Sequence, residues 1–134
     1  MKGSQTGEKV HALDVKEVPK SLERLTDKRV RWALEWLRNH DLTQPAPVGQ
    51  LAKSVHLSSS RLRHLFKSEL GLTITRYRKL LRLEKARDLL RTSFLEVKEI
   101  AGIVGFGDVS HFVRDYKMTY GETPTETRLR DQVG

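Results

Sequence analysis

The chain has 134 residues, of which 37% are hydrophobic and 31% charged, with a formal net charge of +8 and no cysteine. This length supports one small domain or two very small units and excludes a large enzyme joined to a sensor domain. The lack of cysteine excludes disulfide bonds and thiolate metal sites. No apolar run approaches the ~18 residues of a membrane span, and the N-terminus has no apolar signal core, so we expect a cytoplasmic protein with no membrane partner.

Positive charge is unevenly distributed along the chain. Residues 1–27 sum to zero and residues 28–60 to +3, but residues 61–87 hold nine basic and two acidic side chains, a net charge of +7. Residues 88–134 hold six basic and eight acidic side chains, a net charge of −2. A surplus confined to one short stretch favours a face that binds a polyanion, and a solvated helix face is the alternative.

Helical periodicity dominates the predicted elements, taken in chain order. Residues 1–26 have weak periodicity and balanced charge, and we expect a mostly flexible N-terminal tail. Residues 27–39 place apolar side chains on one stripe, which predicts an amphipathic helix, and a short linker, QPAP (44–47), follows. Residues 74–91 contain neither glycine nor proline and carry apolar residues throughout, which predicts one long helix.

A unit of roughly 28 residues occurs twice along the chain, and such repeats determine how the fold is built. The matches at an offset of 50 are Leu62 with Phe112, Phe66 with Tyr116, Lys67 with Lys117, Gly71 with Gly121, Thr73 with Thr123, Thr75 with Thr125, and Arg78 with Arg128. Upstream the offset is 49, where Val55 matches Val104 and Leu57 matches Phe106. A turn between residues 57 and 58 can absorb the difference of one residue.

Each copy has the pattern of a helix-turn-helix. In the first copy, a short helix at 51–55 leads through a turn to Ser58, which can cap a second helix. In the second copy, Gly105 lies at the turn and Asp108 at the cap. The inward-facing residues of the second helices are Leu62, Leu65 and Phe66 in the first copy, and Phe112 and Tyr116 in the second. A capping box with proline at its first position opens a final helix at Thr123.

The second helix of each copy presents a similar polar face on its opposite side. The outward residues are Ser60, Arg63, His64 and Lys67 in the first copy, and Ser110, His111, Arg114 and Lys117 in the second. Arginine, serine and histidine are side chains that contact base edges in a major groove, and lysine serves as a phosphate charge. The duplicated face therefore predicts a protein that binds double-stranded DNA.

The residues of the two copies resemble the DNA-binding domain of AraC/XylS-type bacterial transcription regulators. The segment IAGIVGFGDVSHFVRDYKMTYGETPTETR resembles the signature of that family, and RLRHLFKSELGLT resembles its first half. Thr127 departs from the tyrosine usual before the final arginine. The resemblance implies an all-α, homeodomain-like fold of about seven helices, with two helix-turn-helix subdomains joined by a long linker helix. The predicted division is a tail at 1–26, a first subdomain at 27–72, a linker helix at 73–92 and a second subdomain at 93–134, with 27–131 together forming one domain.

The resemblance further implies two recognition helices, at about 58–68 and 108–118, in consecutive major grooves of an asymmetric site. Base contacts would fall to Ser60, Arg63, His64, Ser110, His111 and Arg114. Backbone contacts are predicted for Ser58, Arg61, Lys67, Asp108 and Lys117. The expected partners are promoter or operator DNA and RNA polymerase, with one monomer bound per site, and no cofactor is expected.

Catalysis, metal binding and other modes of binding are the alternatives to sequence-specific DNA binding. Catalysis by Ser110 and His111 is disfavoured because neighbours on a helix point about 100° apart and cannot pair as nucleophile and base. The histidines show no zinc-binding spacing on a helix. A basic helical protein-interaction module, or a nonspecific nucleic-acid binder, would explain the +7 stretch equally well. The protein-interaction module does not explain the duplicated face. Arg82 and the aromatic residues Phe66, Phe106, Phe112 and Tyr116 are predicted to be structural.

Overall fold

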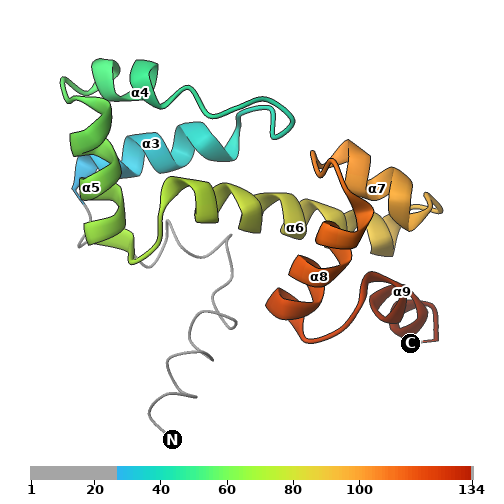
Figure 1. Ribbon diagram of the computed structural model, residues 1–134. Coiled ribbons are helices and arrows are strands. Elements are labelled where there is room, and N and C mark those ends of the chain that lie inside the picture. The colour runs from blue at the N-terminus through green and yellow to red at the C-terminus, as the bar shows by residue number, and fades with distance from the viewer. Residues whose placement is uncertain (1–26, 134) are drawn as a thin grey trace, which may run out of the picture. The chain divides into compact units, whose positions relative to one another are not determined.

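The computed structural model describes residues 27–133, and the tail predicted for residues 1–26 lies outside the described residues. Within the described part the chain forms seven α-helices and no strand, which confirms the all-α prediction (Figure 1). The helices are α3 (Lys28–Arg38), α4 (Val48–Ser54), α5 (Ser59–Leu70), α6 (Ile74–Thr92), α7 (Val97–Ile103), α8 (Val109–Tyr120) and α9 (Pro124–Val133).

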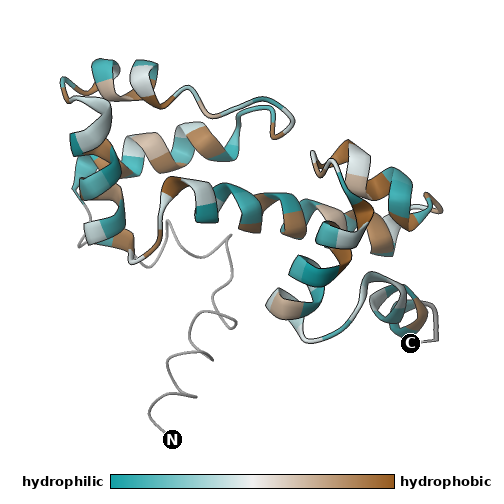
Figure 2. Ribbon diagram, viewed as in Figure 1, coloured by the Kyte–Doolittle hydropathy of each residue, from teal (hydrophilic) through white to brown (hydrophobic). Residues whose placement is uncertain are grey.

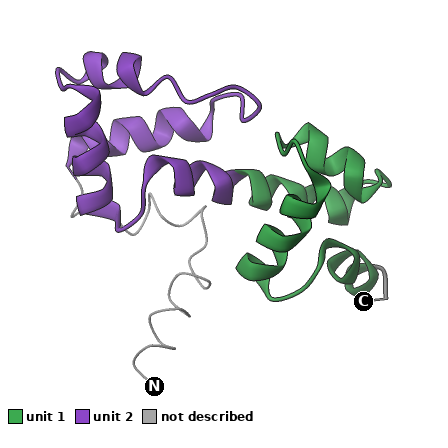
Figure 3. Ribbon diagram, in the orientation of Figure 1, with its two compact units in different colours: residues 1–13, 82–134 green, residues 14–81 purple. Residues whose placement is uncertain are grey.

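The described residues divide into two compact units, which Figure 3 colours separately. The N-terminal unit (residues 27–81, purple) contains α3, α4, α5 and the first part of α6. The C-terminal unit (residues 82–133, green) contains the rest of α6 with α7, α8 and α9. Figure 2 shows hydrophobic and hydrophilic residues interspersed along α6, and its apolar residues enter both cores. The long helix is therefore a structural part of each unit.

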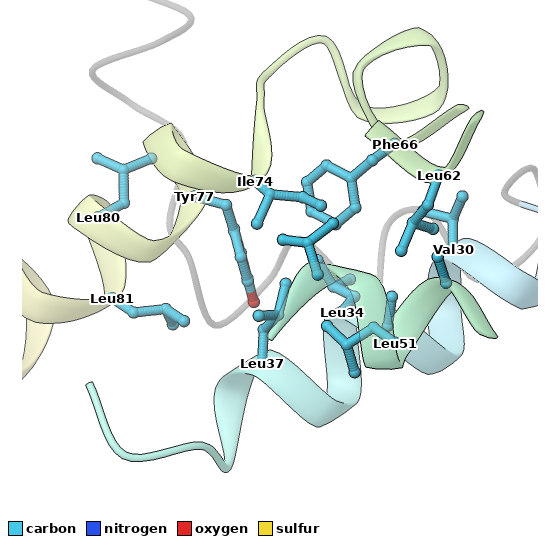
Figure 4. Packing of buried hydrophobic residues seen from close by; sticks show 13 residues of the cluster. Val30, Leu34, Leu37, Leu51, Leu62, Phe66, Ile74, Tyr77, Leu80 and Leu81 are labelled. Atoms are coloured by element: carbon cyan, nitrogen blue, oxygen red, sulfur yellow. The ribbon is translucent and has the colours of Figure 1, made fainter. Parts of the chain in front are cut away.

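The core of the N-terminal unit is built by apolar side chains from all four of its helices (Figure 4). The predicted stripe of α3 is buried throughout, with Val30, Ala33, Leu34 and Leu37 at most 1% exposed. Helix α5 contributes Leu62 and Phe66, and the Phe66 ring packs against that of Tyr77 from α6 with 6.0 Å between ring centroids. Burying side chains of this size stabilises a fold by about 1.5–3 kcal/mol each.

The core of the C-terminal unit follows the same plan. Its buried residues are Leu83, Ala86 and Leu90 of α6, Ile100 and Ala101 of α7, Val104, and Phe112 and Tyr116 of α8. Phe106, in the turn, is only half-buried but meets Phe112 edge to face, 5.3 Å between centroids. The predicted inward orientation of the aromatic residues is confirmed. Thr127, which stands where the family has tyrosine, is fully buried. It accepts a hydrogen bond from the Tyr116 hydroxyl at 2.8 Å and donates one to the Glu122 carboxylate.

Corresponding turns of the two copies adopt corresponding backbone conformations. Gly71 and Gly121, which end α5 and α8, both have φ of 79° and donate to a carbonyl one turn back. In the turn between the first two helices of each copy, Gly105 has φ of 97° and His56, 49 residues earlier, has φ of 62°. This left-handed region suits glycine and costs other residues roughly 1–2 kcal/mol. The repeat therefore keeps this backbone shape even where the glycine is replaced by histidine.

In each copy, an arginine of the last helix binds backbone carbonyls that precede the first helix of the helix-turn-helix. Arg78 of α6 donates to the carbonyl oxygens of Asp41 (3.3 Å), Leu42 (3.4 Å) and Gln44 (2.5 Å). Arg128 of α9 donates to those of Leu90 (3.2 Å), Ser93 (3.1 Å) and Leu95 (2.6 Å). Asp41 and Leu90 are 49 residues apart, as are Gln44 and Ser93. The two arginines, matched in the sequence repeat, thus act as equivalent loop clamps.

The helix starts agree with the predicted caps, except at α4. Ser58 and Asp108 cap α5 and α8, and the predicted capping box at Thr123 and Glu126 opens α9. Helix α4 begins at Val48, three residues before the predicted start, directly after Pro47. Helix α7, for which no start was predicted, begins at Val97, where the Glu99 carboxylate accepts from the backbone N–H of residue 96 at 2.8 Å.

Candidate nucleic-acid interface

Helix α5 exposes the polar face that its sequence predicted. Ser60, Arg63, His64 and Lys67 are all exposed, whereas Leu62 and Phe66 on the other side of the helix have no exposed surface. Arg61, predicted to contact the DNA backbone, is exposed as well. The buried face holds the helix against the core of the N-terminal unit, so its outward side chains are carried on a fixed support.

Helix α8 repeats this arrangement in the C-terminal unit. Ser110, His111, Arg114 and Lys117 are exposed, while Phe112 and Tyr116 are fully buried. The Arg114 side chain is 62% exposed, and its Nε lies 3.5 Å from an oxygen of the Asp115 carboxylate. This neighbouring carboxylate partly offsets the cation. The second face is therefore less positive than the first.

Ser58 and Asp108 occupy the N-caps of the two helices. The Ser58 hydroxyl accepts from the backbone N–H of Arg61 at 3.1 Å, and the Asp108 carboxylate accepts from that of Ser110 at 2.8 Å. Both side chains thus define where each helix begins. The first-turn N–H groups of a helix carry partial positive charge and can bind phosphate. The predicted contacts of these two residues with the DNA backbone remain predictions.

Two exposed apolar side chains on α8 were missed by reasoning from sequence. Val109 is 40% exposed and Met118 is 64% exposed. At the offset of 50 their counterparts on α5 are Ser59 and Ser68, so the second face is the more apolar of the two. The comparison of the two copies contains this difference, but the sequence-based prediction assigned base contacts to polar residues only. Apolar side chains in a major groove can contact the methyl group of thymine.

The charge count of residues 61–87 overstates the positive charge available on the surface. Arg78 is buried by its loop clamp, and Arg87 places its guanidinium 4.2 Å from the centroid of the Tyr120 ring. Arg82 is half-buried, and burial lowers its pKa. The exposed basic residues of this stretch are Arg61, Arg63, Lys67, Arg76 and Lys85. Arginine stems pack readily against apolar surface, which a count of charges cannot register.

Other chemistries find little support among the described residues. No group of three or more histidine, aspartate or glutamate side chains there is placed to hold a metal ion. None of the described helices is both long enough and apolar enough to cross a membrane. Ser110 and His111 are adjacent on α8 and both exposed, which is the arrangement expected of a contact surface.

Known proteins are similar to this chain in sequence and in fold. A family model described as a helix-turn-helix domain matches residues 51–130. The arabinose operon regulatory protein of Escherichia coli (strain K12) is 33% identical over 111 residues, which cover 83% of this chain and 38% of that protein. The xylose operon regulatory protein of the same strain is 36% identical over 104 residues, 78% of this chain and 26% of that protein. The chain thus spans less than half the length of these relatives.

Solved structures agree with this relationship. A probable AraC family transcriptional regulator from Rhodopseudomonas palustris CGA009 superimposes with a TM-score of 0.71 at 28% identity, covering 78% of this chain and 98% of that one. The family model covers more than half of the chain, including both helix-turn-helix copies. The chain therefore belongs to the AraC/XylS family of regulators, as a helix-turn-helix DNA-binding domain.

Proposed function

We propose that this domain binds double-stranded DNA in a sequence-specific manner, with α5 and α8 each inserted into a major groove. One observation carries the proposal: the second helix of each helix-turn-helix copy exposes a polar face at equivalent positions while its opposite face is fully buried. A polar surface built twice on the same helix of each copy fits a ligand that repeats, as the grooves of a duplex do.

The exposed side chains divide into two roles. Arg63 and Arg114 would form paired hydrogen bonds with guanine, and the neighbouring serine and histidine side chains would make shorter polar contacts. Lys67, Lys117 and Arg61 would neutralise phosphates, which position the helices without reading sequence. The base-contacting set is therefore Ser60, Arg63, His64, Ser110, His111 and Arg114.

The two faces differ in detail, which favours an asymmetric site. At the offset of 50, His64 corresponds to Arg114, and Arg63 corresponds to the half-buried Val113. Different side chains at equivalent positions prefer different bases, so the two halves of the site should have unrelated sequences. A single chain with two recognition helices needs no symmetric partner to occupy both halves of the site. We therefore propose that it binds DNA as a monomer.

Transcription regulation is the process in which such binding would act. The arabinose and xylose operon regulatory proteins contain a region similar to this domain. We propose that the present chain likewise regulates promoters from the cytoplasm, with RNA polymerase as a partner.

Selection of bound duplexes from a random library tests the proposal. We expect two unlike sequence blocks about 10 base pairs apart, centre to centre. Arg63→Ala should relax one block and Arg114→Ala the other, with Lys53→Ala, an exposed residue of α4, as the charge-matched control. Affinity should also fall steeply with salt.

Three results would contradict the proposal in different ways. Binding without sequence preference would indicate a nonspecific nucleic-acid binder. A palindromic site would indicate a dimer in which each chain uses one recognition helix per half-site. No binding to any duplex would favour the basic protein-interaction module.

A further inference from the structure

The N-terminal unit has a pocket that takes no part in the proposed DNA interface. It lies on the outer side of α3 and the loop that follows, with a volume of about 380 Å³. Its lining residues are Trp32, Glu35, Trp36, Asn39, His40 and Asp41. A cavity of this size falls within the range of ligand pockets, roughly 300–1,000 Å³. None of these residues belongs to the predicted DNA-contacting set.

The pocket has an aromatic wall formed by Trp32 and by Trp36, which also packs against the core. Trp32 is 41% exposed, although tryptophan is usually well buried. One helical turn later, the half-buried Trp36 stacks on the imidazole of His40, with 4.4 Å between centroids and 29° between planes. These are the two tryptophans of the chain, so both indole rings lie at this one site. An indole face attracts cations through its ring quadrupole, more strongly than the other aromatic side chains do.

The pocket also carries a local negative charge. Residues 28–60 contain five basic side chains and two acidic ones, and both of the acidic residues, Glu35 and Asp41, line the pocket and are exposed. The Asp41 carboxylate is oriented by hydrogen bonds from the backbone N–H of Thr43 (2.9 Å) and its hydroxyl (2.7 Å). The pocket lining thus holds two carboxylates and no lysine or arginine side chain, which favours a cationic ligand over a phosphate.

We propose that this pocket binds an arginine side chain presented by a partner protein. A guanidinium group is planar, stacks on aromatic faces and pairs with carboxylates through two parallel hydrogen bonds, which matches indole rings beside Glu35 and Asp41. Lysine offers a compact charge with less to gain from the ring faces. The pocket is larger than one guanidinium group, so a neighbouring apolar residue of the partner can rest against the exposed ring of Trp32. This function goes beyond DNA binding and uses a different surface.

Intrinsic tryptophan fluorescence tests this proposal without a label, because both fluorophores line the pocket. The probe is an acetylated, amidated tetra-arginine peptide, titrated into the full chain without DNA. Tetra-lysine and tetra-glutamate peptides serve as comparisons. We expect saturable binding that is tighter for arginine than for lysine and absent for glutamate. The overall charge of +8 opposes attachment of a cationic peptide elsewhere on the protein.

Charge-neutral variants locate the binding. The double variant Glu35→Gln and Asp41→Asn preserves side-chain shape, and the asparagine oxygen can still accept from Thr43. It should weaken arginine-peptide binding by about five-fold or more, as expected for loss of exposed ion pairs. The control Asp131→Asn removes an exposed carboxylate from the C-terminal unit and should leave binding unchanged. Circular dichroism verifies that each variant is folded.

Several results would overturn the proposal. They are no fluorescence change up to millimolar peptide, equal affinity for arginine and lysine, or equal binding by the double variant and the wild-type protein. A fluorescence change with protein concentration alone, without peptide, would assign the pocket to a second copy of the chain instead.

Discussion

The loop clamp of Arg78 gives the sharpest test of how the helix-turn-helix is held in place. Its guanidinium donates to three loop carbonyls, at residues 41, 42 and 44, and the residue is only 6% exposed. A hydrogen bond to a charged group contributes about 1.5–3 kcal/mol. Two of the three loop residues are exposed, so water can replace part of what is lost. We therefore expect Arg78→Met, which keeps the apolar stem, to lower the free energy of unfolding by about 3 kcal/mol.

Urea unfolding followed by tryptophan fluorescence measures this effect, because both tryptophans belong to the N-terminal unit. The matched control is Arg76→Met, an exposed arginine one half-turn earlier on α6, which should change stability by less than about 0.5 kcal/mol. A loss below about 1 kcal/mol in Arg78→Met would refute the reasoning. It would mean that the loop carbonyls are equally well satisfied by water.

Three further predictions concern the arginines of the recognition helices, the turn residues with positive φ and the acidic side chain of Glu122. Arg63→Ala should weaken specific DNA binding more than Arg114→Ala, because Arg63 lies in the most basic stretch and Arg114 has a carboxylate 3.5 Å away; the reverse order in one gel-shift series would contradict this. Gly105→Ala should destabilise the protein by about 1–2 kcal/mol, whereas His56→Gly should be neutral or stabilising, since both residues have positive φ; thermal unfolding showing similar losses would exclude backbone strain as the cause. Hydrogen bonds from Thr127 and then Arg130 lower the pKa of Glu122, so its contribution to stability is fully present above its ordinary pKa of 4.5 and disappears as the pH falls through the lower folded value. The stability difference between the wild-type protein and Glu122→Gln should accordingly narrow during acid titration, and a difference that stays constant down to pH 2 would rule out this linkage.

The helices and their buried faces could be predicted because they depend on spacing alone. Leu62 and Phe66, or Phe112 and Tyr116, fall on one side of a helix whatever lies opposite them. The helix caps at Ser58 and Asp108 could be predicted as well, because each side chain accepts a hydrogen bond from a backbone N–H only two or three residues away. The exposed polar faces followed from these local patterns.

Features that depend on distant parts of the chain could not be predicted in the same way. The repeat paired Arg78 with Arg128, but the role of both side chains depends on carbonyls more than 30 residues away in sequence. The basic stretch consequently seemed more available to DNA than it is. The pocket beside α3 was missed because the stacking of Trp36 on His40 depends on how the helix ends, which the spacing of apolar residues does not determine.

The sharing of α6 by both units bears on how the domain could have arisen and how it can be divided. Leu80 and Leu81 of this helix enter one core, and Leu83 and Ala86 enter the other. The two copies are therefore an overlapping duplication, in which the last helix of one copy is also the first helix of the next. A fragment intended to carry a single recognition helix has to retain the part of α6 that enters its core, as 27–92 or 74–133 would. Cleavage of α6 before Leu80 would remove core residues from the N-terminal unit alone, and cleavage of α6 after Leu83 would remove them from the C-terminal unit alone.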